Sequence, residues 1–547
     1  MGTLRAFRAA TFLLCSATCL PYSWCTTFNW TNSLGGNWQT AANWSPAGGP
    51  PGAGDFAMIN LNVPVSLSAS TGALIGLTLE NGARVSTNGN QLNVAGTNAN
   101  TFLFGTGTTG GNTRLVVDDG AGLGFDFVSH FFSMHQGAEL RMQGGGAIAS
   151  FGINVSPSSL ISGHGAVVLL GSGTRFDVAG TVRPMNGNLT LSSIAANRLD
   201  LDGNIGGDEF GLLDVTSTGN LIISGSLTDS YSGVINIGNS RKIDFNTAFA
   251  MDGDLTFTSS SGNRISAPMI TYETGATVTV NQAIGEIDAV THWPGSAVIQ
   301  LPNASSELHL LGDSTFAFTN VFSGLGRLVN QSGATMTLED GVDIGSKLVN
   351  HGTLQIGSSA GSVLLEDYQQ SIGGRLKIEL GPPLTGNFDQ ITITENAGLS
   401  GMLDVSLLSG FTLSPGDSFK IINIDGTLTQ HFNNLGEGAS VDIFDDVELF
   451  ITYFGGDGND IVLFTKRPGD FDFDGDVDGR DFLIWQRGGS PNPLSASDLA
   501  DWQANYGLPQ TATATPVPEP GKLMLMTACF LYVFNQRVRS QQFFQGS

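Results

Sequence analysis

Six aspartates stand within one short stretch near the C-terminal end of the chain: Asp470, Asp472, Asp474, Asp476, Asp478 and Asp481. Their spacing matches positions 1, 3, 5, 7, 9 and 12 of a twelve-residue calcium loop, and Gly475 stands at position 6, where such a loop turns sharply. Ca²⁺ takes six to eight oxygen ligands in a flexible geometry. Carboxylates this close together repel one another unless a cation lies between them. The spacing therefore predicts a calcium site, and an acidic solvated loop is the alternative.

A second pattern follows the aspartates and repeats after seventeen residues. Asp481-Phe-Leu-Ile-Trp485-Gln recurs as Asp498-Leu-Ala-Asp-Trp502-Gln, with apolar residues at helical spacing. Residues 467–508 resemble a dockerin, a short α-helical, EF-hand-like module with two calcium loops that end in Asp rather than Glu. In dockerins the two helices bind a cohesin partner.

The second loop departs from that family pattern. Its positions 1, 3 and 5 are Arg487, Gly489 and Pro491, which cannot hold calcium. The resemblance thus implies one intact ion site. Because the second calcium loop is degenerate, we expect a structural module that is held together by one calcium ion. Docking to a cohesin-like partner stays open as the alternative.

The composition narrows the class of protein. The chain has 547 residues, 74 of them glycine, and is 41% hydrophobic but only 13% charged, which favours a many-turned β protein over a disordered chain. There are 23 basic residues against 48 acidic ones, a formal net charge of −25, so a nucleic-acid partner is disfavoured. The cysteines are Cys15, Cys19, Cys25 and Cys529, so the body between them has no disulfide.

Both ends of the chain have the composition of targeting segments. Arg5 and Arg8 precede the apolar stretch Ala9–Leu20, and residues 1–25 are therefore predicted to be a secretory signal peptide. Residues 509–516 have the Thr/Ala composition of a linker.

Residues 517–547 resemble a PEP-CTERM sorting tail. They contain Pro518-Glu519-Pro520, then the apolar run Gly521–Phe534, then Arg537 and Arg539. The resemblance implies delivery to a bacterial cell envelope, outer surface or extracellular matrix by an exosortase-type sorting protease, with transient membrane contact through the tail. The apolar run is short for a bilayer core of about 30 Å, so we leave open whether the tail anchors the chain or is removed.

The long body, residues 26–372, is predicted to be a right-handed parallel β-solenoid. Short apolar strands alternate with Gly, Asn, Ser and Thr turns throughout. Gly326-Arg-Leu-Val-Asn330 is followed twenty residues later by Ser346-Lys-Leu-Val-Asn350, which is a solenoid-like period. The repeated asparagines are expected at turns, where they bond the backbone or stack as a ladder. A stack of β-sandwiches is the alternative.

Three tryptophans open this body, at Trp30, Trp38 and Trp44. The segment resembles the start of autotransporter-like, repeat-rich surface proteins. We expect these side chains to cap the first coil, which would otherwise expose a sheet edge. Stacking on carbohydrate is the alternative function of such aromatics.

Residues 373–466 are predicted to form a separate, small β-sandwich-like domain, because the strands there become longer and alternate more cleanly. The run Gly455–Leu463 also fits a calcium-binding nonapeptide of β-rolls. Such ions lie between successive copies, and this chain has one copy, so a tight turn is expected.

No zinc-protease, paired-cysteine or phosphate-loop motif is found in the sequence, and the 48 acidic residues are too dispersed to reveal a catalytic pair. The sequence therefore predicts no enzyme but a secreted structural or adhesive protein. The alternative is a carbohydrate-binding or polysaccharide-degrading β-helix protein, a hydrolase or lyase.

Overall fold

The computed structural model describes residues 25–96, 102–105, 113–118, 126–135, 137–171, 176–194, 199–201, 211–258, 261–472 and 476–507. The signal-peptide prediction (all but Cys25), the linker and the sorting tail lie outside these residues, as does Asp474. The chain divides into two compact units, one of residues 1–337 and 342–352, the other of residues 338–341 and 353–547. In the described residues, no helix is both long enough and apolar enough to cross a membrane.

The elements that begin before residue 353 are β1 (Thr27–Trp30), β2 (Gly36–Asn37), the 3₁₀ turn η1 (Ala41–Asn43), β3 (Trp44–Ser45), β4 (Phe56–Ile59), β5 (Pro64–Ser66), β6 (Gly76–Leu79), β7 (Arg84–Ser86), β8 (Leu92–Val94), β9 (Phe102–Phe104), β10 (Arg114–Asp118), β11 (Phe127–Met134), β12 (Glu139–Val155), β13 (Leu160–Leu169), β14 (Phe176–Val178), β15 (Thr181–Ser193), β16 (Leu199–Asp200), β17 (Leu212–Val215), β18 (Leu221–Ser224), β19 (Val234–Gly238), β20 (Lys242–Phe245), β21 (Phe249–Met251), β22 (Asp254–Thr258), β23 (Asn263–Tyr272), β24 (Thr277–Asn281), β25 (Ile284–Trp293), β26 (Val298–Gln300), β27 (Glu307–Leu310), β28 (Ser314–Phe316), β29 (Val321–Ser323), β30 (Arg327–Asn330), β31 (Thr335–Leu338) and β32 (Asp343–Asn350).

The later elements are β33 (Thr353–Ile356), β34 (Ser362–Gln370), β35 (Arg375–Leu380), β36 (Gln390–Ile393), β37 (Ala397–Gly398), β38 (Met402–Leu407), β39 (Ser418–Ile424), β40 (Ser440–Phe444), β41 (Val447–Gly455), β42 (Asp460–Thr465), α1 (Gly479–Gln486) and α2 (Ala496–Asn505).

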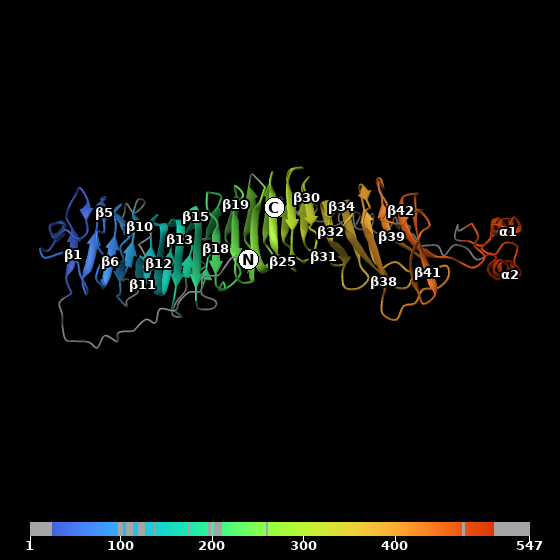
Figure 1. The fold of residues 1–547 in the computed structure, drawn as a ribbon, viewed down its shortest axis with the longest axis horizontal. Helices are drawn as coiled ribbons and strands as arrows, with labels where there is room; N and C mark the ends of the chain where they lie inside the picture. Colours follow the sequence, from blue (N-terminus) through green and yellow to red (C-terminus); the bar gives the residue numbers. More distant parts are fainter. Residues whose placement is uncertain are drawn as a thin grey trace, which may run out of the picture. The chain divides into compact units, whose positions relative to one another are not determined.

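The parallel strands form a β-solenoid of about 13 turns, so the solenoid prediction is confirmed. Within the first unit each strand lies beside the strand one coil later, as Figure 1 shows. The twenty-residue repeat is seen directly in β30 and β32, where Leu328 pairs with Leu348 and Asn330 with Asn350. The handedness of the coil stays a prediction.

The core is built from columns of side chains that stack from coil to coil. Strand residues alternate between the inner and outer face. One inward column starts with aliphatic residues and ends with two asparagines: Leu221, Ile243, Ile265, Ile287, Leu310, Asn330 and Asn350. The last two form the expected ladder, in which the amide nitrogen of buried Asn330 donates to the Oδ1 atom of buried Asn350 at 2.9 Å.

The Trp-rich cap also forms. Trp30, Trp38 and Trp44 are all buried, and Trp44 makes edge-to-face contacts with the other two rings at centroid distances of 5.0 and 4.8 Å. The Nε1 atom of Trp44 donates to the carbonyl of Trp38 at 2.8 Å. Because their faces are covered by protein, these rings pack the first coils and are not exposed for stacking on a sugar.

The predicted β-sandwich at residues 373–466 is not confirmed. In the second unit β33, β35 and β38 pair in parallel, as do β34, β36 and β39, so the solenoid pattern continues to Ile424. In the described part of the second unit, antiparallel pairing begins with β39, which pairs with β42; β42 in turn pairs with β41, and β41 with β40. Clean alternation of apolar residues is common to both architectures, so the pattern itself did not distinguish them.

Candidate functional site

Asp481 is the residue around which the aspartate loop is organised. Its side chain is fully buried at the start of α1. One carboxylate oxygen accepts the backbone N–H groups of Phe471 at 2.6 Å and Asp472 at 3.1 Å, and the other accepts that of Asp478 at 2.8 Å. Asp481 thus ties the beginning of the loop to its end. The last contact also completes a capping box, because the Asp478 side chain in turn caps the helix.

The aspartates predicted as calcium ligands come together in two overlapping groups. Carboxylate oxygens of Asp470, Asp472 and Asp481 lie within 4.8 Å of one another, and so do those of Asp476, Asp478 and Asp481. Within the described residues these are the two groups of acidic, histidine or cysteine side chains with such geometry. Asp481 belongs to both, so five of the six predicted ligands lie in two groups that share this residue.

This donor set fits calcium. Every ligand atom offered is a carboxylate oxygen, the hard donor that Ca²⁺ prefers. A carboxylate has about four lone-pair sites, and Asp481 uses three of them on backbone N–H groups, which leaves one for an ion. When bound, the ion would supply the positive charge that opposes the mutual repulsion of these aspartates.

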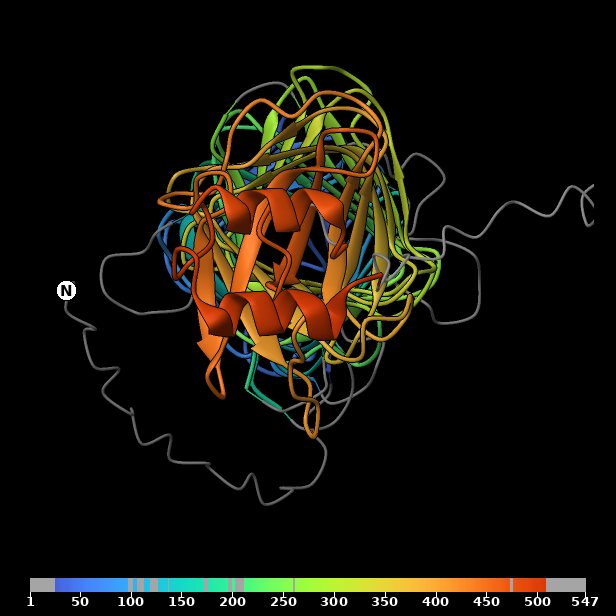
Figure 2. The same cartoon turned by 90° about the vertical axis from the view of Figure 1, so that its right-hand side faces the viewer.

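The two helices that follow the start of the aspartate loop, α1 and α2, are joined by two reciprocal hydrogen bonds. The indole of Trp485 in α1 donates to the carbonyl of Ser495, the N-cap of α2, at 3.0 Å. The indole of Trp502 in α2 donates to the carbonyl of Asp478, the N-cap of α1, at 2.7 Å. Donors and acceptors are both seventeen residues apart, so the sequence repeat is also a structural repeat. Figure 2 shows the two helices side by side.

Aromatic packing holds the pair together. Phe482 stacks near Trp502 with ring centroids 4.8 Å apart, and Trp502 meets Tyr506 at 4.9 Å. Gly469 has a φ of 91°, and a Cβ atom there would lie 2.6 Å from the Cα of Trp502, so only glycine fits. The chain that enters the loop is therefore packed directly against α2.

The second half of the repeat closes without acidic neighbours. Asp498 stands where Asp481 stands in the first half, and it is also buried. Its carboxylate accepts the backbone N–H of Asn492 at 2.8 Å and the side-chain amide of Asn492 at 3.1 Å. Burial alone would raise the pKa of Asp498, but the hydrogen bonds from Asn492, Ser490 and Ser495 outweigh it and lower the pKa to about 2. Protein donors thus do here what a cation would do in the first half.

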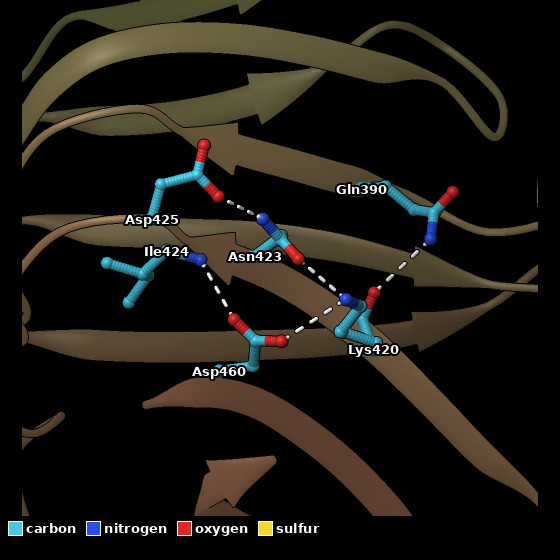
Figure 3. Close-up of polar contacts among 6 residues, drawn as sticks. All are labelled: Gln390, Lys420, Asn423, Ile424, Asp425 and Asp460. Carbon is cyan, nitrogen blue, oxygen red and sulfur yellow. Dashed lines mark hydrogen bonds and ion pairs between the residues drawn. The ribbon is translucent and has the colours of Figure 1, made fainter. Parts of the chain in front are cut away.

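The nonapeptide-like motif forms a tight turn, as expected. Gly455 and Asp460 pair across the end of the β41–β42 hairpin, and the N–H of Gly458 bonds to the carbonyl of Gly455 at 2.9 Å. Asp460 is buried and its carboxylate accepts from the Lys420 ammonium at 3.2 Å and from the N–H of Ile424 at 2.9 Å (Figure 3). The ion pair joins β42 to β39, and the ammonium group of Lys420 balances the charge of the Asp460 carboxylate.

A cleft of about 560 Å³ lies elsewhere in the second unit and was not predicted. Its floor is the outer face of three parallel strands, where Gln355 of β33, Lys377 of β35 and Asp404 of β38 stand in register. Val441 and Asp442 of β40 also line it. The hairpin that follows the last coil therefore supplies a wall to a sheet face that would otherwise be open.

Two carboxyl groups in this cleft have unusual surroundings. Asp389 is 1% exposed, and its oxygens accept the N–H groups of Gly361 at 3.0 Å and Glu379 at 2.7 Å. Burial raises the pKa of Asp389 to about 7, and the negative charge of Glu379 acts in the same direction. The two hydrogen bonds oppose this shift. The Oε2 atom of Glu379 is buried and has no hydrogen-bond partner among the described residues.

Sequence reasoning missed this pair because Asp389 lies in the turn between β35 and β36, and the hydrogen bond that brings it back to the N–H of Glu379 is seen only in the folded coil. Glu379 and Lys377 stand at outward positions of an alternating strand, which is a weak signal, and nothing marks Asp389. The sequence also contains Gly357-Ser-Ser-Ala-Gly361, which has the letters of a GxSxG nucleophile elbow. It joins β33 directly to β34 with no helix after it, so it lacks the strand–turn–helix context that exposes such a serine.

No protein-family model matches the chain, and no curated protein matches it. The loop, the helices and the cleft are therefore the features that bear on its function.

Proposed function

We propose that this chain is a secreted structural or adhesive protein of a bacterial cell envelope or extracellular matrix, with one structural calcium ion in its C-terminal helical module. The observation that carries the proposal is the convergence of carboxylates around Asp481, set against the self-sufficient Asp498 of the second half. Extracellular modules bind Ca²⁺ with dissociation constants of about 10⁻⁴–10⁻³ M. A module that uses Ca²⁺ to hold its loop suits a setting outside the cell.

The calcium site is the part most directly tested. Isothermal titration of the full-length protein with CaCl₂, after chelation, should give one ion per chain. The double variant Asp470→Ala with Asp472→Ala should abolish the binding. Asp498→Asn is the matched control, because it changes the equivalent buried carboxylate in the half that uses protein donors, and it should leave the stoichiometry at one. Two ions per chain would contradict the proposal.

The solenoid supports the structural part of the proposal. Its inner columns are filled with apolar side chains that leave the coil interior packed rather than hollow. The dockerin-like identity of residues 467–508 belongs to this proposal, with the helices as a calcium-clipped end rather than a cohesin-docking surface.

Export and sorting are tested on native material. Mass spectrometry of the mature protein should detect no peptide before about residue 18 and none after about residue 520, if the leader and the tail are removed as their resemblances imply. Recovery of the segment from Gln541 to Ser547 in the mature surface form would contradict removal of the tail, and would favour a membrane anchor.

A carbohydrate-binding role is the second candidate, and the cleft beside Glu379 favours it. Clefts lined by a few convergent polar groups are where small ligands bind in proteins. This role is compatible with adhesion, since a matrix protein holds its surroundings by binding them.

A further inference from the structure

The cleft formed by β33, β35, β38 and β40 has three features that together favour one class of ligand. It is open to solvent and lined mainly by polar side chains. It holds a buried carboxylate oxygen, Glu379 Oε2, for which the described part of the chain offers no donor. It also carries more acidic than basic side chains, with Glu379, Asp389, Asp404 and Asp442 beside Lys377.

We propose that this cleft binds an uncharged oligosaccharide, with Glu379 and Asp442 accepting hydrogen bonds from sugar hydroxyl groups. The proposal rests on the adhesive role proposed above and says what the protein adheres to.

The charges select among ligands. Asp404 is already paired with the guanidinium of Arg375, so it draws no further cation to the site. The remaining acidic side chains, Glu379 and Asp442, outnumber Lys377, so the cleft disfavours uronates and sulfated sugars. No group of carboxylates here is close enough to hold a metal ion, since among the described residues such groups occur only in the aspartate loop. A neutral donor of several hydroxyl groups remains as the ligand that fits.

The geometry assigns distinct roles to the lining residues. Lys377 and Gln355 stand in register on adjacent strands and can contact successive hydroxyl groups along the ladder. Asp389 accepts the N–H groups of Gly361 and Glu379, so it positions the backbone of Glu379 rather than contacting the ligand.

The test is isothermal titration of the full-length protein with cellopentaose, xylopentaose and laminaripentaose, and with a galacturonate pentamer as the charged comparison. At least one neutral oligosaccharide should bind and the galacturonate pentamer should not. Glu379→Gln and Asp442→Asn should each weaken that binding about tenfold, the loss expected for one hydrogen bond to a charged acceptor. Asp442 is exposed, so its variant folds even if Glu379→Gln does not.

Glu366→Gln is the matched control, because Glu366 is an exposed glutamate on neighbouring β34 and does not line the cleft. It should bind as the unmodified protein does. The inference is overturned if no neutral oligosaccharide binds at about 1 mM, if both cleft variants bind normally, or if the galacturonate pentamer binds more tightly. Calcium titration of the same samples separates the outcomes: if the unmodified protein binds one calcium ion but no neutral oligosaccharide, this inference is refuted and the structural proposal stands.

Discussion

Replacing Asp481 by alanine should do more damage than any other single change in the aspartate loop. Its buried carboxylate accepts three backbone N–H groups, those of Phe471, Asp472 and Asp478. A hydrogen bond to a charged group contributes about 1.5–3 kcal/mol. Because the freed N–H groups can reach water in part, we expect a net loss of roughly 3–5 kcal/mol in the local unfolding free energy of the module, before any calcium is considered.

Calcium adds a second term that only an intact first loop can use. An ion that binds the folded state alone stabilises it by about 2.7 kcal/mol at a free concentration of a hundred times the dissociation constant. Asp481→Ala should lose this increment together with the hydrogen bonds. Asp498→Ala should also destabilise the module, but by the same amount with and without calcium, because Asn492 and not an ion faces that carboxylate.

Hydrogen–deuterium exchange measures both terms in the full-length protein. Peptides that cover α1 and α2 report the local opening free energy, and the measurement is repeated in calcium and in chelator. The reasoning is refuted if Asp481→Ala keeps the calcium-dependent protection, or if Asp498→Ala loses it. Peptides from the solenoid, such as β30 to β32, should exchange identically in all samples and serve as the internal reference.

Three further outcomes are expected. The pKa of Asp389 is raised to about 7, so the folded chain keeps a proton that the unfolded chain releases near pH 4. The unfolding free energy should therefore fall by on the order of 4 kcal/mol as pH rises from 4 to 7, and denaturant titrations of Asp389→Asn should not show this decrease. Asn350→Ala removes the acceptor of the Asn330 amide and should cost about 1–3 kcal/mol in urea unfolding, whereas a cost near zero would show that the ladder contributes nothing. Trp38→Ala should cost about 3–5 kcal/mol through the cavity that it leaves in the cap, with sugar binding unchanged; weakened sugar binding in a folded sample would contradict the purely structural role of this tryptophan.

The features that were predictable are those written into short stretches of sequence. The twenty-residue repeat between Leu328 and Leu348 predicted the length of that one coil, because a residue of one coil stacks on its equivalent in the next. The seventeen-residue repeat between Trp485 and Trp502 likewise predicted two packed helices, because apolar spacing and capping residues are local properties of the sequence.

The prediction of a separate sandwich is not confirmed, and the strand pattern explains why it could not be decided from the sequence. Alternation along a strand says which face is buried but not whether the neighbouring strand is parallel or antiparallel. Pairing of Leu376 with Leu354 and Leu403 depends on the lengths of the intervening turns, which place the strands of successive coils in register. The solenoid therefore runs on to β39 through a region whose pattern alone suits either architecture.

By itself, the sequence determined the calcium-type spacing of the aspartates, the strand period and the tryptophan-rich start, because each depends on neighbours within one turn or one coil. Only the tertiary structure decided that Glu379 and Asp389 share a cleft with Asp442, and that Asp460 pairs with Lys420. Asp442 and Asp460 lie in the last hairpins, tens of residues from their partners along the chain, and the fold-back of these hairpins brings them together. Long-range register is set by the summed packing of the whole core, which no local pattern records.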